Sequence, residues 1–261
     1  MKTIITRADD CASSHAANTA IAQAARLGFL KNISVMAVCP FVDEAASLFA
    51  HRSDLCFGLH ITLNAEWDRV TWGPLTNAPS LTDGRGAFYP DPVLFQKSPP
   101  PLDEVMGEVE AQYQRLISAG FSLSYAECHM LPERYVPGLQ TLLSEWCHQK
   151  GLLDFSFYAQ PVLPYMDDVS TTPGLLEQVL KNLPEGQYFY VAHPALYGDE
   201  MLLTGNRNAR GEDVARHRAA DAAFLSDETT LALCRMYDVK TIRLDEAKPG
   251  AYRVWKPGPM L

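Results

Sequence analysis

Two adjacent aspartates and three separated histidines are the residues of this sequence whose types and positions fit catalysis. Asp9 and Asp10 end the segment TIITRADD, and His60, His129 and His193 each stand in or directly after an apolar segment. Neighbouring carboxylates raise each other's proton affinity unless a cation lies close to them. One carboxylate and two imidazoles form a suitable ligand set for a divalent ion, with positions left for water and substrate. The pattern favours a metal site, and its ion would offset the repulsion between the aspartates.

Within this hypothesis the residues take different roles. We expect Asp10, His60 and His129 to bind the metal, and Asp9 to lie close enough to act as a base toward its bound water. Two simpler interpretations stay open at this point. Aspartates favour helix N-termini, and a helical pattern starts just after Asp10. A single histidine in an apolar strand is often a hydrogen-bonded core residue.

The elements that must position these residues alternate along the chain. Apolar or β-branched runs predict seven strands, at residues 3–8, 33–38, 55–63, 123–130, 153–159, 187–193 and 239–244. Helical patterns lie between them, at residues 14–30, 42–52, 102–121, 137–151, 173–183 and 213–238. Several of the strands are almost continuously apolar, as is typical of parallel strands covered on both faces.

This alternation predicts an α/β fold. We expect a (β/α) barrel-like architecture, seven-stranded or distorted, formed by a single domain over residues 1–261. An open doubly wound sheet is the alternative. In a barrel the catalytic residues gather at the C-terminal ends of the strands, where Asp9, Asp10, His129 and His193 fall.

Two long βα loop insertions interrupt the pattern, at residues 66–103 and 194–213. Such insertions in a compact domain often form a lid or a binding loop. The first contains Trp67 and Trp72, whose rings are candidates for substrate binding. The alternative is that these aromatic side chains only pack the loop onto the barrel.

Composition narrows the class of protein. The formal net charge of −9 argues against nucleic acid as a partner. No apolar run is long enough to span a membrane, and Arg7 with the two aspartates interrupts any signal-peptide core. The six cysteines are scattered, as is typical of reduced thiols. We therefore expect a cytoplasmic protein without nucleic-acid or membrane partners, and homo-oligomerisation stays open.

Several motifs resemble those of the YdjC-like carbohydrate deacetylase family. The segment TRADDCASSHAANTAI is similar to the N-terminal Asp-Asp motif of that family, FGLHITL to its Gly-Leu-His segment, and AHPALYGDE to its late His-Pro segment. The region 213–246 is similar to its final helix and strand. The resemblance covers nearly the whole chain in order.

The resemblance implies a metal-dependent hydrolase with a barrel-like fold that removes acetyl groups from N-acetylated sugars such as chitooligosaccharides. The family's metal ligands fall on Asp10, His60 and His129, and its general base falls on Asp9. The late histidine falls on His193, with an acid or substrate-orienting role. One divalent ion, Mg²⁺ or Zn²⁺, is the implied cofactor, and a small acetylated sugar is the implied partner.

Other positions leave alternatives open. Where the family usually has Asp-Ser-His-x-His, this chain has Glu127 for the aspartate and Leu131 for the second histidine, which puts the sugar specificity in doubt. Arg216 and Arg218 fall on a basic segment of the family and are candidates for binding an anionic substrate, the alternative being solvated helix residues. A different metal hydrolase, such as a phosphoesterase or an amidohydrolase, and a non-catalytic sugar-binding protein are the competing functions.

Overall fold

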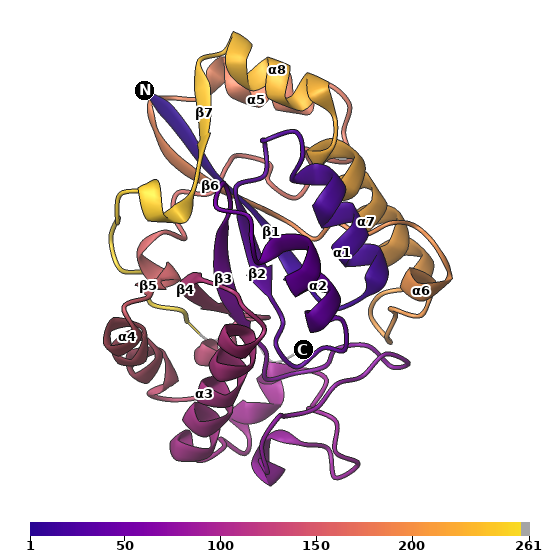
Figure 1. Cartoon of the computed structure of the whole chain (residues 1–261), viewed down its shortest axis with the longest axis vertical. Coiled ribbons are helices and arrows are strands. Elements are labelled where there is room, and N and C mark those ends of the chain that lie inside the picture. The colour runs from indigo at the N-terminus through magenta and orange to yellow at the C-terminus, as the bar shows by residue number, and fades with distance from the viewer. Residues whose placement is uncertain (257–261) are drawn as a thin grey trace.

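The computed structural model describes residues 1–256, and its centre is a seven-stranded, all-parallel sheet that curls into a half-barrel surrounded by helices (Figure 1). The strands are β1 (Lys2–Cys11), β2 (Asn32–Val35), β3 (Cys56–Ile61), β4 (Leu123–Cys128), β5 (Leu153–Asp154), β6 (Gly186–Ala192) and β7 (Val239–Ile242). The helices are α1 (His15–Ala24), α2 (Val42–Phe49), α3 (Leu102–Ser118), α4 (Leu139–Lys150), α5 (Leu175–Asn182), α6 (Asp199–Leu202), α7 (Gly211–Leu225) and α8 (Glu228–Met236). The predicted barrel-like α/β class is confirmed.

The strand order is β5-β4-β3-β2-β1-β6, and β7 also pairs with β1. β1 pairs with β7 over Lys2–Ile5 and with β2 from Arg7 onward, so these two short strands follow one another along the same edge of β1. Asn32 joins them, because its side chain donates to the Ile242 carbonyl at 3.1 Å and accepts from the Leu244 N–H at 2.7 Å. β1 thus pairs with three strands, β2, β6 and β7, although it stands next to the end of the strand order.

Apart from α6, which lies in the insertion 194–213, the helices form where the sequence predicts them, and local signals fix several of their ends. Ser14 caps α1 by accepting a 2.9 Å hydrogen bond from the Ala17 N–H. In α3, the residues Val105, Val109 and Leu116 are completely buried, as their three- and four-residue spacing predicts. No helix of the described residues is long and apolar enough to cross a membrane.

Two further elements differ from the sequence prediction. The predicted strand 153–159 is a strand only at Leu153–Asp154, because the Asp154 carboxylate accepts the Ser156 N–H at 2.8 Å and turns the chain into a 3₁₀ helix. The predicted helix 213–238 is two helices, α7 and α8. Asp227 separates them, since its carboxylate accepts the Thr229 N–H at 2.8 Å and caps α8.

The long insertion 66–103 is anchored by carboxylates of α3. Glu108 is fully buried and accepts hydrogen bonds from the N–H groups of Leu75 and Thr76 at 3.1 and 2.9 Å. Glu104 accepts from the N–H of Ser80 at 2.8 Å. These contacts hold an irregular segment against α3, and the same insertion places Trp67 and Trp72 near the end of β1.

Candidate metal centre

Asp9 and Asp10, the two carboxylates at the end of β1, contact different neighbours. Asp10 has a positive φ of 60°, and the pairing of β1 with β2 shifts register between Ala8 and Cys11. This left-handed backbone breaks the ordinary strand alternation and is rare for a residue other than glycine. Asp10 therefore contacts the histidines of the neighbouring strands, whereas Asp9 contacts Arg7. Such strain persists only where surrounding contacts enforce it, and it is typical of functional sites.

Asp10, His60 and His129 converge at the C-terminal edge of the sheet. The Asp10 Oδ1 atom lies 3.3 Å from His60 Nε2 and 3.4 Å from His129 Nδ1, and the two nitrogens are 3.1 Å apart. All three side chains are buried. His60 lies in β3, and the backbone N–H of His129, directly after β4, is held by the Ile61 carbonyl at 2.9 Å. The parallel pairing of β3 with β4 thus brings together two histidines that are 69 positions apart.

This triangle of atoms fits a metal ion. Asp10 Oδ1 is buried and accepts no hydrogen bond from any residue in the described range 1–256, although it faces two imidazole nitrogens. Ligand atoms about 2.1 Å from a common ion are separated by roughly 3.0–3.4 Å, which matches the three distances here. One carboxylate oxygen and two imidazole nitrogens are also a suitable donor set for a divalent cation.

Each histidine is oriented by a carboxylate on its opposite nitrogen. His60 Nδ1 hydrogen-bonds Glu127 Oε1, its register partner across β3 and β4. His129 Nε2 hydrogen-bonds Glu66 Oε2 at 3.0 Å. Carboxylates in this position fix the tautomer and the orientation of metal-binding imidazoles. Glu127, a departure from the family motif, therefore serves a clear structural purpose in this chain.

Asp9 lies beside this group and is bound by a buried arginine. Arg7 Nε and Nη2 donate to the two oxygens of Asp9 at 2.6 and 2.7 Å, and Nη2 also reaches Glu127 Oε2 at 3.3 Å. The guanidinium lies 4.3 Å from the ring centroid of Phe155 and 4.9 Å from that of Phe189. Burial raises the pKa of Asp9, but Arg7, with smaller effects of the nearby histidines, lowers it below its usual value. Asp9 is therefore an ionised carboxylate held in one orientation.

The electrostatics of the three candidate ligands follow from burial and from their neighbours. Burial raises the pKa of Asp10, yet Arg218 and the two histidines bring it well below its usual range. Burial lowers the pKa of His60, but Glu127 and Asp9 raise it to about 9. Burial likewise lowers the pKa of His129, which Glu66 and Asp10 raise well above its ordinary value. The carboxylates around the two imidazoles therefore favour positive charge at this point, either on the imidazoles or on a bound cation.

Arg218, rather than Arg216, faces the site. Arg218 Nη2 donates to Asp10 Oδ2 at 2.7 Å, and its side chain is only 10% exposed. Arg216 has a side chain that is 70% exposed and pairs with Glu212 on the outer face of α7. The side chain of Arg216, a candidate for binding the substrate, therefore lies on the outer surface, because a two-residue step along a helix changes the face.

The remaining predicted residues lie around Asp10 or Asp9. Trp67 and Trp72 line a cavity beside Asp10, and the ring of Trp67 lies 5.9 Å from the Arg218 guanidinium. The indole N–H of Trp72 donates to the Asn64 carbonyl at 2.7 Å. His193 follows β6, its backbone N–H donates to Asp221 at 2.9 Å, and its charge contributes to the lowered pKa of Asp9.

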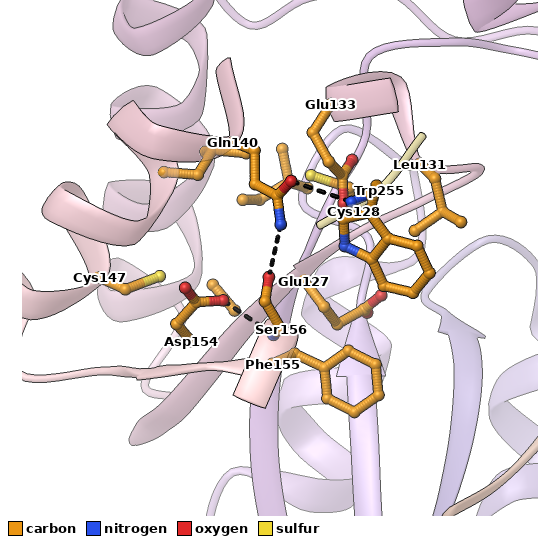
Figure 2. Close-up of a pocket in the computed structure, with 13 residues that line it drawn as sticks. Glu127, Cys128, Leu131, Glu133, Gln140, Cys147, Asp154, Phe155, Ser156 and Trp255 are labelled. Carbon is orange, nitrogen blue, oxygen red and sulfur yellow. Dashed lines mark hydrogen bonds between the residues drawn. The ribbon is translucent and has the colours of Figure 1, made fainter. Parts of the chain in front are cut away.

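A second cavity, of about 20 Å³, lies behind Glu127. Glu127, Glu133, Gln140, Asp154 and Trp255 gather around it (Figure 2). Its volume suffices for about one water molecule, so it is too small for a sugar. Leu131, which stands where the family commonly has a second histidine, lines this cavity and does not belong to the group of candidate ligands.

The predicted ligands Asp10, His60 and His129 lie together in the structure. The sequence prediction did not identify Arg7 and Glu66 as their neighbours, and it gave Arg218 only as a candidate for binding an anionic substrate. Arg7 is two residues before Asp9 in a strand, a spacing that places both side chains on one face and was a usable signal. Glu66 lies at the start of an irregular insertion, and no sequence period indicates its contact with His129.

The curled parallel sheet and its buried Asp-His-His group define an α/β half-barrel with a candidate metal centre at the C-terminal edge of its strands. The chain belongs to the YdjC-like protein family, whose sequence model matches residues 3–236.

Curated relatives share sequence with this chain, and solved structures share its fold. A carbohydrate deacetylase of Thermoanaerobacter pseudethanolicus is 24% identical over 90% of this chain and 95% of its own length. One of Vibrio parahaemolyticus is 26% identical over 77% of this chain and 80% of its own length. The crystal structure of a candidate cellobiose-phosphate cleavage protein from Enterococcus faecalis V583 shares the fold, with a TM-score of 0.75, 17% identity and coverage of 94% of this chain and 98% of that chain. The Bc1960 peptidoglycan N-acetylglucosamine deacetylase is more distant, with a TM-score of 0.52, 10% identity and coverage of 97% and 90%.

Proposed function

We propose that this chain is a metal-dependent carbohydrate deacetylase that hydrolyses the N-acetyl group of amino sugars such as N-acetylglucosamine and its short β-1,4 oligomers. The observation that carries the proposal is the convergence of Asp10 Oδ1, His60 Nε2 and His129 Nδ1 in a chain of the YdjC-like family. The names of the relatives from Thermoanaerobacter and Vibrio support the substrate class.

Asp10, His60 and His129 are the residues that would hold the ion. When bound, a divalent cation supplies a Lewis acid that polarises a carbonyl and lowers the pKa of water. Two imidazoles with one carboxylate suit Zn²⁺, and Mg²⁺, a harder ion, is the second candidate. Glu66 and Glu127 keep the two imidazoles oriented toward Asp10.

Asp9 and His193 are the proposed acid–base pair. In the hydrolysis, a water oxygen bonds to the acetyl carbon, the carbon–nitrogen bond breaks, and the nitrogen gains a proton, which yields acetate and a free amine. Asp9 accepts the proton of the water, and Arg7 holds its carboxylate in place for that step. His193, whose imidazole is partly exposed beside Asp9, donates a proton to the leaving amine. General acid–base help of this kind contributes about 10²–10⁴-fold to the rate.

The test is acetate release from N-acetylglucosamine and its dimer and trimer. The protein is treated with a chelator, and Zn²⁺ or Mg²⁺ is added back singly. We expect acetate and free amine in equal amounts, only after an ion is restored. The Asp10→Asn variant should lose this activity, while Glu145→Gln, a change at an exposed residue of α4, should keep it.

Absence of acetate with every ion, in a protein that binds one ion per chain, would overturn the deacetylase proposal. Phosphate release from sugar phosphates by the same protein would then assign the site to a phosphoesterase. Absence of ion binding would overturn the metal centre itself. Asp9 and Asp10 would then have a structural role.

A further inference from the structure

A cavity of about 190 Å³ opens directly beside Asp10, and its walls are mostly apolar. The apolar side chains that form it come from the loop before α2, the long insertion and the segment around α6: Phe41, Trp67, Val70, Trp72, Met201 and Leu203. Of the three candidate metal ligands, Asp10 lines this cavity, so the cavity adjoins the candidate metal centre on the Asp10 side.

Most polar side chains of this cavity already have partners within the protein. Ser14 Oγ accepts the Ala17 N–H at 2.9 Å, and both carboxylate oxygens of Glu200 accept backbone N–H groups at the start of α1. Thr204 donates its hydroxyl to the Met201 carbonyl at 2.6 Å. Arg218 is bound to Asp10. A sugar ring, which carries several hydroxyl groups, would lose hydrogen bonds to water here without replacing them.

The volume of the cavity is also larger than an acetyl group occupies. A water molecule takes up about 30 Å³ in the liquid, so the cavity has room for several methylene groups beyond the single methyl of acetate. An apolar wall of this extent stabilises an apolar chain, because each buried methylene adds favourable transfer free energy.

We propose that this cavity receives the acyl group of the substrate and that the enzyme hydrolyses N-acyl sugars with acyl chains longer than acetyl, such as butanoyl. The inference rests on the proposed deacetylase function and names its acyl specificity. The reaction is the same amide hydrolysis: water adds to the acyl carbon, the carbon–nitrogen bond breaks, and the products are a carboxylic acid and the free amino sugar.

The first test compares N-acetyl-, N-propanoyl- and N-butanoylglucosamine as substrates of the metal-loaded protein, with release of glucosamine as the readout. We expect kcat/KM to rise about fourfold for each added methylene, hence on the order of tenfold from acetyl to butanoyl. A fall of tenfold or more from acetyl to propanoyl would overturn the acyl specificity and leave the deacetylase function intact. Release from none of the three would overturn both.

The second test measures binding without turnover. Trp67 and Trp72 line the cavity, so occupancy is expected to change tryptophan fluorescence in chelator-treated protein. N-butanoylglucosamine should bind at least several-fold more tightly than N-acetylglucosamine. Equal affinities would show that the longer acyl chain gains nothing from the cavity and would overturn the proposal. A fluorescence change with glucosamine alone would place the sugar ring in the cavity and would overturn it as well.

A matched pair of variants locates the effect. Val70→Phe fills part of the cavity and should lower the ratio of butanoyl to acetyl turnover by about tenfold. Leu94→Phe makes a similar enlargement at an exposed position of the same insertion, away from the cavity, and should leave the ratio unchanged. An unchanged ratio in a folded Val70→Phe variant would contradict the placement of the acyl chain.

Discussion

Glu66 accepts a 3.0 Å hydrogen bond from His129 Nε2, and this contact leaves Nδ1 as the imidazole nitrogen that faces Asp10. His60 has the reverse arrangement, with Nδ1 toward Glu127 and Nε2 toward Asp10. The two histidines thus present different nitrogens to one point, and each needs its own carboxylate to do so. The candidate centre consists of five residues rather than three.

The first prediction concerns this outer pair of carboxylates. Glu66→Gln should weaken divalent-ion binding by about 10–100-fold, because the neutral amide holds the His129 imidazole less firmly and lowers its basicity. Titration calorimetry on chelator-treated protein measures the change. Glu145→Gln is the control with the same chemistry at an exposed site. Equal affinities of both variants and the wild type would remove Glu66 from the metal centre.

The second prediction separates proton transfer from ion binding. Asp9→Asn should lower kcat for deacetylation by about 10²–10⁴-fold, since it removes the proposed proton acceptor. The affinity for the ion should change only a few-fold, because Asp9 is bound to Arg7 and is not one of the three converging ligands. Full turnover by Asp9→Asn would end its assignment as general base, and loss of ion binding would make it a ligand.

The third prediction compares two arginines of one helix. Arg218→Met leaves the buried Asp10 Oδ2 without its partner, which should lower the free energy of unfolding of the metal-free protein by about 3 kcal/mol. Arg216→Met removes an exposed pair with Glu212 and should cause no measurable change. Urea unfolding of both variants measures the difference. Similar stabilities would show that the ion pair of Arg218 does not offset the burial of Asp10.

The fourth prediction is a pH dependence outside the metal centre. Burial, with the nearby carboxylates Glu127 and Asp154 adding to it, raises the pKa of Glu133 from 4.5 to about 7 (Figure 2). The folded chain then holds this proton more firmly than the unfolded chain, so the contribution of Glu133 to stability falls as the pH rises from about 4.5 to about 7. The difference in pKa corresponds to about 3 kcal/mol at most.

Glu133→Gln tests this dependence, because the amide stays neutral at every pH. The variant should be more stable than the wild type at pH 8 and equally stable at pH 4.5, as measured by urea midpoints at the two pH values. A variant that is less stable than the wild type at pH 8 would mean that the ionised carboxylate is stabilising, against the direction given by its burial.

Much of the fold follows from local sequence signals. The alternation of apolar and helical segments predicted the strands and the α/β class, because parallel strands buried on both faces are short, almost continuously apolar runs. The errors fall where one polar side chain overrides the pattern. Asp154 ends β5 after two residues, and Asp227 divides the last predicted helix, through hydrogen bonds that apolar periodicity does not encode.

Some residues of the candidate site could be predicted from the sequence, and others could not. Strand ends indicated Asp10, His60 and His129, because the carboxyl ends of parallel strands share one edge of the sheet. The partner of Asp10 was not predictable in the same way. Arg216 and Arg218 are alike in sequence, and only the orientation of α7 decides that Arg218 reaches Asp10 while Arg216 reaches solvent.

By itself the sequence determined the elements, their order and the residue types available for metal chemistry, since these depend on local propensity and on the two-residue and 3.6-residue periods. Only the tertiary structure decided which atoms meet. The positive φ of Asp10 separates it from Asp9, the curl of the sheet brings β3 and β4 to its oxygen, and an irregular insertion supplies Glu66. These relationships depend on contacts between segments far apart in the chain, and the packing of the whole domain sets such contacts.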